Sequence, residues 1–153
     1  MKTSKLIGLL IIAGLMTATL DSCKKYEDGP AISFRSKKKR VVNTWRLDKY
    51  YWNGIEATSS LLIAGYTEEY TDNGSYSRSY IDKDGDFFSE TGKWDFDSDK
   101  DNLVINGVSS IELTDKNSTV TNTNSTILKL KQNELWYQFQ NGGDLHEFQF
   151  VTK

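Results

Sequence analysis

Residue types that could perform catalysis or bind a metal are sparse in this chain of 153 residues. His146 is the single histidine and Cys23 the single cysteine, so the sequence offers neither a zinc ligand set nor a disulfide. One histidine also gives no basis for a catalytic triad, and we expect it on a strand, at the surface or half-buried. Glu68 and Glu69 are adjacent, so they point to opposite faces of a strand and cannot form a glycosidase pair. We therefore expect a protein that is not an enzyme and uses no cofactor.

Aspartates alternate along two segments, which is a spacing that calcium loops use. The first segment contains Asp82, Asp84 and Asp86, and the second contains Asp95, Asp97, Asp99 and Asp101. If Asp97 were the first ligand, Val108 would stand at the position of the bidentate glutamate and Asn102 at that of the turn glycine. We therefore reject an EF-hand, expect no metal site, and interpret these aspartates as parts of polar turns.

Aromatic side chains and one arginine offer the most suggestive chemistry. Tyr66 and Tyr70 share one face of a predicted strand, and Tyr76, Arg78 and Tyr80 share one face of the next. If these faces point inward, the five side chains line a cup at the open end of a barrel. Such a cup would suit a ligand with an apolar body and an acidic head. An inward Arg78 would need an anion or a carboxylate at the barrel mouth. The alternative is that the aromatic side chains simply fill a small barrel.

A hydrophobic pattern of period two positions these faces, and it runs from Thr44 onward with turn residues about every eight to twelve positions. Its clearest element is a hairpin in which Asp72-Asn73-Gly74 joins strands over residues 66–71 and 75–81. No segment is long enough for a parallel crossover helix, which excludes a doubly wound sheet. The pattern predicts an all-β fold, a small up-and-down antiparallel barrel of about eight or nine strands.

A short helix precedes the strands, beginning at Ser33 or Ser36 and ending near Asn43, and we interpret it as a lid or plug. Trp45 opens the first strand, so we expect it to anchor the core at the closed end of the barrel. The polar residues 115–124 predict a mobile loop. The other strands are predicted over residues 45–52, 87–88 (a brief edge strand), 92–97, 102–106 and 109–114 (joined by Asn106-Gly107), 125–130, 135–140 and 145–151.

The N-terminus has the features of a bacterial export and lipidation signal. A basic start is followed by about fifteen mostly apolar residues, which are few for a permanent membrane helix. Leu20-Asp21-Ser22-Cys23 resembles the lipobox of bacterial lipoproteins. We predict a signal peptide over residues 1–22, a tether lipidated on Cys23 over residues 23–32, and one domain over residues 33–153. Lys24 is not the aspartate of an inner-membrane retention signal, which favours the outer membrane and leaves the periplasmic and cell-surface sides open.

Five segments together resemble a known group of proteins. They are residues 23–30, Ser33 to Lys38, Asn43-Thr44-Trp45, Gly92-Lys93-Trp94 and residues 128–135. This set is similar to the lipocalin-like domain lipoproteins of Gram-negative bacteria. The resemblance covers nearly the whole chain, and it implies a lipocalin-like barrel on an outer-membrane lipid anchor. The function of that family is mostly unassigned.

The formal net charge is −2, and the single dense basic run at residues 37–40 fits a solvated helix face, so we expect no nucleic-acid partner. We expect a monomer whose partners are the membrane, through its lipid anchor, and a small apolar or amphipathic ligand bound without catalysis. The alternative is a structural or protein-interaction lipoprotein of the cell envelope with a solid barrel core. An internal cavity in the structure would favour the first of these functions.

Overall fold

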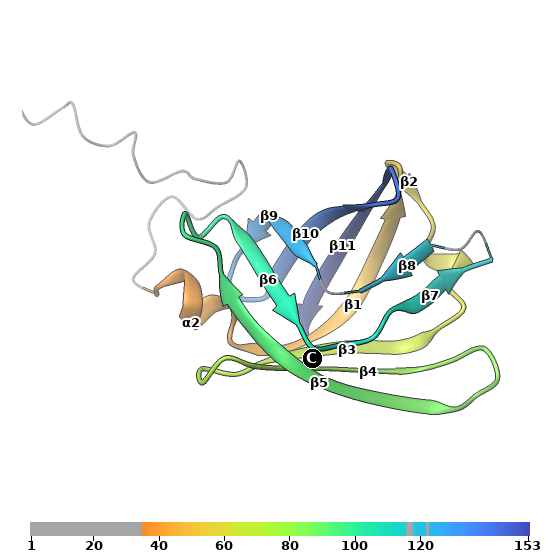
Figure 1. Cartoon of the computed structure of the whole chain (residues 1–153), viewed down its shortest axis with the longest axis horizontal. Coiled ribbons are helices and arrows are strands. Elements are labelled where there is room, and N and C mark those ends of the chain that lie inside the picture. The colour runs from red at the N-terminus through yellow and green to blue at the C-terminus, as the bar shows by residue number, and fades with distance from the viewer. Residues whose placement is uncertain (1–34, 116–117, 122) are drawn as a thin grey trace, which may run out of the picture.

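The computed structural model describes residues 35–115, 118–121 and 123–153, which are nearly all β-structure (Figure 1). The predicted signal peptide, tether and Cys23 lie outside the described residues. Within them, no helix is long and apolar enough to cross a membrane. The elements are α2 (Lys37–Val41), β1 (Asn43–Trp52), β2 (Ile55–Glu56), the 3-10 helix η2 (Thr58–Ser60), β3 (Ala64–Tyr70), β4 (Ser75–Ile81), β5 (Phe87–Phe96), β6 (Asn102–Asn106), β7 (Ile111–Thr114), β8 (Ser118–Val120), β9 (Asn124–Leu130), β10 (Glu134–Asn141) and β11 (Asp144–Thr152).

Eight strands form a closed antiparallel barrel in the order β1, β3, β4, β5, β6, β9, β10, β11. Pairing of β11 with β1 closes the sheet, from Trp45 opposite Thr152 to Trp52 opposite His146. The short strand β2 adds only a two-residue pairing to β1. The predicted small up-and-down barrel is therefore confirmed, and closure leaves its eight strands without the unpaired edges of an open sheet.

Helix α2 covers one end of the barrel, which we call the closed end. Ser36 caps the helix, because its hydroxyl accepts a hydrogen bond from the Lys39 amide at 3.3 Å. Trp45 lies directly beneath the helix, fully buried, and its indole N–H donates to the Val41 carbonyl at 2.8 Å. The prediction that Trp45 anchors the core at the closed end is confirmed.

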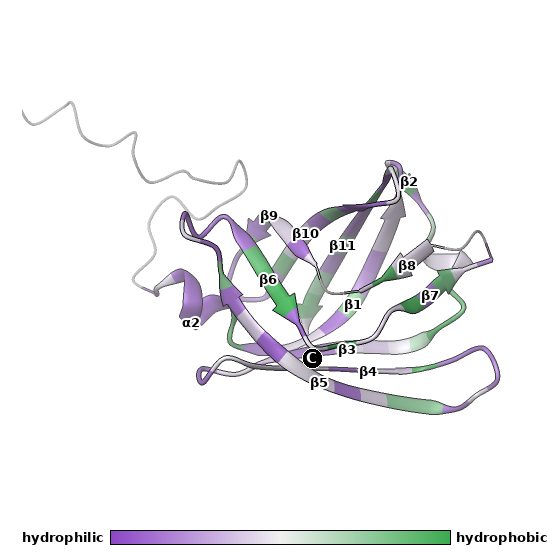
Figure 2. Cartoon of the chain, in the orientation of Figure 1, coloured by the Kyte–Doolittle hydropathy of each residue, from purple (hydrophilic) through white to green (hydrophobic). Residues whose placement is uncertain are grey.

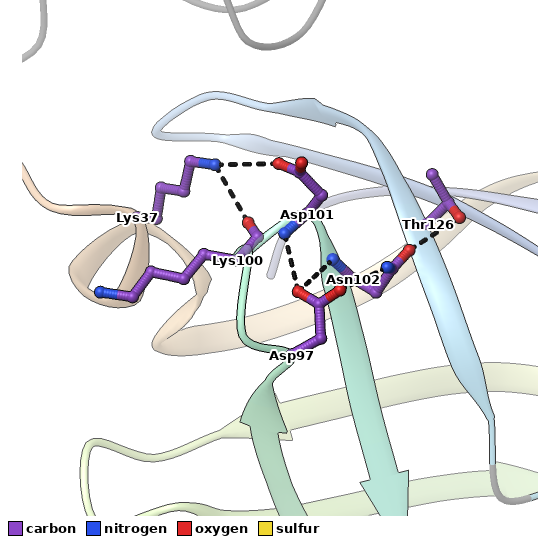
Figure 3. A network of polar contacts seen from close by, with 6 residues as sticks. All are labelled: Lys37, Asp97, Lys100, Asp101, Asn102 and Thr126. Carbon is purple, nitrogen blue, oxygen red and sulfur yellow. Dashed lines mark hydrogen bonds and ion pairs between the residues drawn. The ribbon is translucent and has the colours of Figure 1, made fainter.

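The alternating aspartates of the β5–β6 turn hold this end together (Figure 3). Asp97 accepts hydrogen bonds from the amides of Asp101 and Asn102 and from the Asn102 side chain, the last at 2.6 Å. These bonds, led by that of the Asn102 side chain, lower the pKa of Asp97. The Lys37 ammonium reaches from α2 to Asp101 at 3.3 Å and to the Lys100 carbonyl at 3.0 Å. Asp97 and Asp101 thus organise a turn, and no cluster of potential metal ligands occurs among the described residues.

Strand β5 is longer than the sequence predicted. Instead of a brief edge strand and a separate second strand, residues Phe87–Phe96 form one strand that pairs along β4 from Ile81 opposite Phe87 to Ser75 opposite Lys93. The intervening residues 89–91 are Ser, Glu and Thr, which show no alternation of apolar and polar residues. The hydrophobic pattern therefore did not predict that backbone pairing makes one continuous strand of this segment.

The opposite end of the barrel, which we call the mouth, holds a separate hairpin of β7 and β8. Residues 109–114 were expected to pair with β6, but β6 pairs with β5 and β9, whereas β7 pairs with β8 alone. The expected mobile loop over residues 115–124 was also wrong in part, because it contains β8. Ile111, Leu113 and Val120 of this hairpin are buried, and Figure 2 shows hydrophobic residues on β7 and β8. Burial of these few apolar side chains outweighs the polar composition of the segment.

Candidate functional site

The interior of the barrel contains a buried carboxylate surrounded by tyrosines, on the part of β3 that pairs with Trp45. Glu68 is 1% exposed and accepts hydrogen bonds from four phenol hydroxyls. The donors are Tyr66 at 2.8 Å, Tyr70 at 2.7 Å, Tyr76 at 2.9 Å and Tyr137 at 2.8 Å. Because β3 alternates, Tyr66, Glu68 and Tyr70 face inward together, and neighbouring strands bring Tyr76 and Tyr137 to the same carboxylate.

The electrostatics of this cluster keep the tyrosines as hydrogen-bond donors. Burial, followed by the negative charge of Glu68, raises the pKa values of these four tyrosines well above the ordinary value near 10. A protonated phenol donates, and an ionised carboxylate has about four acceptor sites. The four hydroxyls are therefore all engaged with Glu68.

Arg78 is buried beside this cluster, directly opposite Glu68 in the β3–β4 register. Its ion-pair partner, however, is Glu90 on the neighbouring strand β5. Its Nε donates to Glu90 at 2.7 Å, and its Nη2 contacts the same carboxylate and the Ser109 carbonyl. Burial lowers the pKa of Arg78, but Tyr66, Tyr76 and Glu90 outweigh that effect, so its pKa lies above the ordinary value. The carboxylate partner that an inward Arg78 requires is thus supplied by the chain itself.

All five side chains singled out in the sequence, Tyr66, Tyr70, Tyr76, Arg78 and Tyr80, lie inside the barrel. Three of the tyrosines contact Glu68, and Arg78 contacts Glu90. Of the five, Tyr80 also lines a cleft at the mouth. Their role in ligand binding stays a prediction. Glu68 was missed as their common partner, although the alternation that placed Tyr66 and Tyr70 inward also places Glu68 inward.

The first cleft at the mouth lies between β4, β5, β7 and the segment before β3, and its volume is about 260 Å³. Tyr80 stacks on Phe88 in its wall, with ring centroids 5.4 Å apart. Phe87 next to it is 69% exposed, and Figure 2 shows hydrophobic residues at this end of β5. The lining residues are Leu62, Ile63, Tyr80, Asp82, Lys83, Phe88, Ser110, Ile111 and Glu112.

The second cleft lies between the end of β1, β2, η2 and the end of β7, and its volume is about 450 Å³. We call it the Trp52 cleft. Trp52 and Ile55 face each other across the Asn53-Gly54 turn, in which both residues have positive φ, as a tight hairpin turn requires. The lining residues are Trp52, Asn53, Ile55, Glu56, Ala57, Ser60, Thr114 and Asp115.

His146 was expected at the surface or half-buried, but it lies fully buried beneath the mouth. It is 1% exposed, and its Nδ1 lies 2.8 Å from the Tyr50 hydroxyl. Burial lowers the pKa of His146, and the nearby Asp144 partly offsets this effect. The imidazole also stacks on Phe139, with ring centroids 5.1 Å apart. These contacts give His146 a structural role in the core.

Comparison with protein-family models found no match, and no curated protein matches the chain. Among solved structures, the chain is similar to a lipocalin-like protein from Bacteroides uniformis, with 14% sequence identity and a TM-score of 0.49 over 74% of this chain and 99% of that chain. It is also similar to apocrustacyanin C2, with 17% identity and a TM-score of 0.44 over 74% of this chain and 61% of that chain. At such identities a likeness concerns the fold, and the all-β barrel assignment rests on the strand pairing described above.

Proposed function

We propose that this protein is lipid-anchored to the outer membrane and binds a small apolar or amphipathic ligand, without catalysis, at the mouth of its barrel. The observation that supports this most is the pair of clefts on either side of β7, each of which has apolar side chains in its lining. By contrast, the polar groups of the interior are largely bonded to one another. A ligand therefore gains more at the mouth than in the interior, where it would have to displace the bonds to Glu68.

Exposed apolar side chains gather around the same clefts. They are Ile55 at 73%, Phe87 at 69%, Phe88 at 42% and Ile81 at 40% exposure. Covering apolar surface stabilises a complex by about 25 cal/mol per Å² removed from water. An apolar ligand seated at the mouth would recover part of this free energy.

The ligand proposal is tested by calorimetric titration of the purified full-length chain with octanol and octyl glucoside below their aggregation limits. We expect saturable binding that is weakened at least about threefold by Phe88→Ser, which removes apolar area from the wall of the first cleft. Leu128→Ser on β9, which lines neither cleft, is the matched control and should leave binding unchanged. Absence of saturable binding to any amphiphile would refute the proposal.

The anchoring proposal is supported by the lipobox-like sequence that ends at Cys23. In cells fed a labelled palmitate analogue, the natural chain should acquire label and partition into a detergent phase, and Cys23→Ala should do neither. A Cys23→Ala chain that is still labelled would show that Cys23 is not the site of acylation.

A protein-interaction or structural role in the cell envelope is the second candidate. It is favoured by the side-chain packing of the interior and by the exposed tip of the β4–β5 hairpin, where Ile81 pairs with Phe87. This candidate predicts no saturable binding of amphiphiles. It also predicts a complex, detected by crosslinking in intact cells, that is lost in Phe87→Ser.

A further inference from the structure

The two clefts at the mouth differ in charge. Lys83 lines the first cleft together with Asp82 and Glu112. The described residues that line the Trp52 cleft include two charged ones, Glu56 and Asp115, and both are acidic and exposed. Among the described lining residues, a ligand in the Trp52 cleft therefore meets two carboxylates and no cation.

The walls of the Trp52 cleft suit a ligand that has both an apolar body and a positive charge. Trp52 and Ile55 form a cross-strand pair, and Ile55 is 73% exposed, so its side chain is open to contact. The indole face of a tryptophan attracts cations more strongly than the other aromatic rings do, and quaternary ammonium groups are favoured ligands of such faces. The volume of about 450 Å³ lies within the usual range for small-molecule sites.

Arg78 could have favoured an acidic ligand, but it adds no positive charge to the lining of either cleft. It is bound to Glu90 and the Ser109 carbonyl and lines neither cleft. An anionic head in the Trp52 cleft would lie beside the carboxylates of Glu56 and Asp115, and the repulsion between like charges is unfavourable.

We infer that the Trp52 cleft binds a small amphipathic organic cation, with the ammonium group against the indole of Trp52 and beside Glu56 and Asp115, and the apolar body against Ile55. The inference rests on the proposed function and narrows the class of ligand. Because the carboxylates are exposed, their attraction is screened, and binding should weaken as salt is raised.

The test compares three probes that share one alkyl chain and differ in charge: octyltrimethylammonium, octanol and octyl sulfate. By calorimetry on the full-length chain at low salt, we expect the cation to bind at least about fivefold more tightly than octanol, and octyl sulfate to bind most weakly. The double variant Glu56→Gln, Asp115→Asn should reduce the preference for the cation to less than about twofold and leave octanol binding unchanged. Glu112→Gln, which removes one carboxylate from the first cleft, is the control and should preserve the preference.

The indole N–H resonance of Trp52, assigned with a Trp52→Phe variant, reports the location of the bound probe. It should move on addition of octyltrimethylammonium, while that of buried Trp45 stays fixed. Equal affinity for the three probes, or binding of the cation that leaves the Trp52 resonance in place, would overturn the inference and leave the proposed function standing. Failure of all three probes to bind would overturn both.

Discussion

The interior and the mouth of this barrel use polar and apolar groups in opposite ways. In the interior, Glu68 is covered by four tyrosine hydroxyls and Arg78 is paired with Glu90, so titratable groups are buried and partnered. At the mouth, Ile55 and Phe87 are mostly exposed, and apolar side chains form part of the lining of both clefts beside β7. The difference indicates that the buried polar cluster stabilises the fold, and that the surface available to a ligand is built by turns and by the β7–β8 hairpin.

The largest effect that separates the two regions is expected from Glu68→Leu. This change leaves four buried hydroxyls without their common acceptor, and each unpaired buried donor costs about 1–3 kcal/mol. We expect the free energy of unfolding in urea to fall by at least about 4 kcal/mol. Glu69→Leu, the exposed neighbour on the outer face of β3, is the control and should change stability by about 0.5 kcal/mol or less. A loss below about 1 kcal/mol for Glu68→Leu would show that the Glu68 cluster does not stabilise the fold.

Two tryptophans on β1 provide the next comparison. Trp45 is fully buried under α2, whereas Trp52 is half-buried in the wall of its cleft. Trp45→Ala should cost about 3–5 kcal/mol, the usual cost of emptying a large aromatic site, and Trp52→Ala clearly less. Equal losses in urea unfolding would show that the mouth is packed as tightly as the closed end.

The pH dependence of stability tests the buried histidine between these regions. Because burial lowers the pKa of His146 in the folded state, the unfolded state takes up a proton first as the pH falls below about 6.5. Stability is then lost progressively between that pH and the lower folded pKa, at no more than about 1.4 kcal/mol per pH unit for one proton. Urea unfolding from pH 7.5 to 5.5 should show this slope, and His146→Gln should flatten it. An unchanged slope in the variant would assign the pH effect to other groups.

The smallest effect on stability is expected from Ile55→Ser. Its side chain is largely in water already, so the free energy of unfolding should change by about 0.5 kcal/mol or less. The same variant should weaken octyltrimethylammonium binding about threefold, since it removes apolar wall from the Trp52 cleft. If Ile55→Ser lowered the free energy of unfolding but left octyltrimethylammonium binding unchanged, Ile55 would stabilise the fold and not contact the ligand.

The elements that the sequence predicted well are those in which local chemistry and burial agree. The Asp72-Asn73-Gly74 turn joins β3 and β4 as expected, with Gly74 at a φ of +81° and Tyr70 opposite Tyr76. Ser36 caps α2, and the alternating tyrosines of β3 and β4 face inward. In each case one residue type satisfies both a backbone requirement and a packing requirement.

The elements that could not be predicted depend on contacts between distant segments. Nothing near Glu68 in the sequence shows that Tyr137 will reach its carboxylate from β10. The β7–β8 hairpin has few apolar residues, and it is held by distant contacts such as the Leu62 amide to the Leu113 carbonyl and the Asn141 side chain to Thr119. The clefts at the mouth also depend on this hairpin, so most of their lining was beyond reach of the pattern, although Tyr80 was expected at the open end and lines the first cleft.

The location of a bound neutral amphiphile tests the central claim most directly. In a full-length chain with labelled isoleucine methyl groups, nuclear Overhauser contacts to octanol should appear at Ile55, Ile63 or Ile111, which line the two clefts. None should appear at Ile105 or Ile127, which are buried in the interior. Contacts from octanol to Ile105 or Ile127 that match or exceed those at the mouth would contradict the account, because the ligand would then occupy the interior.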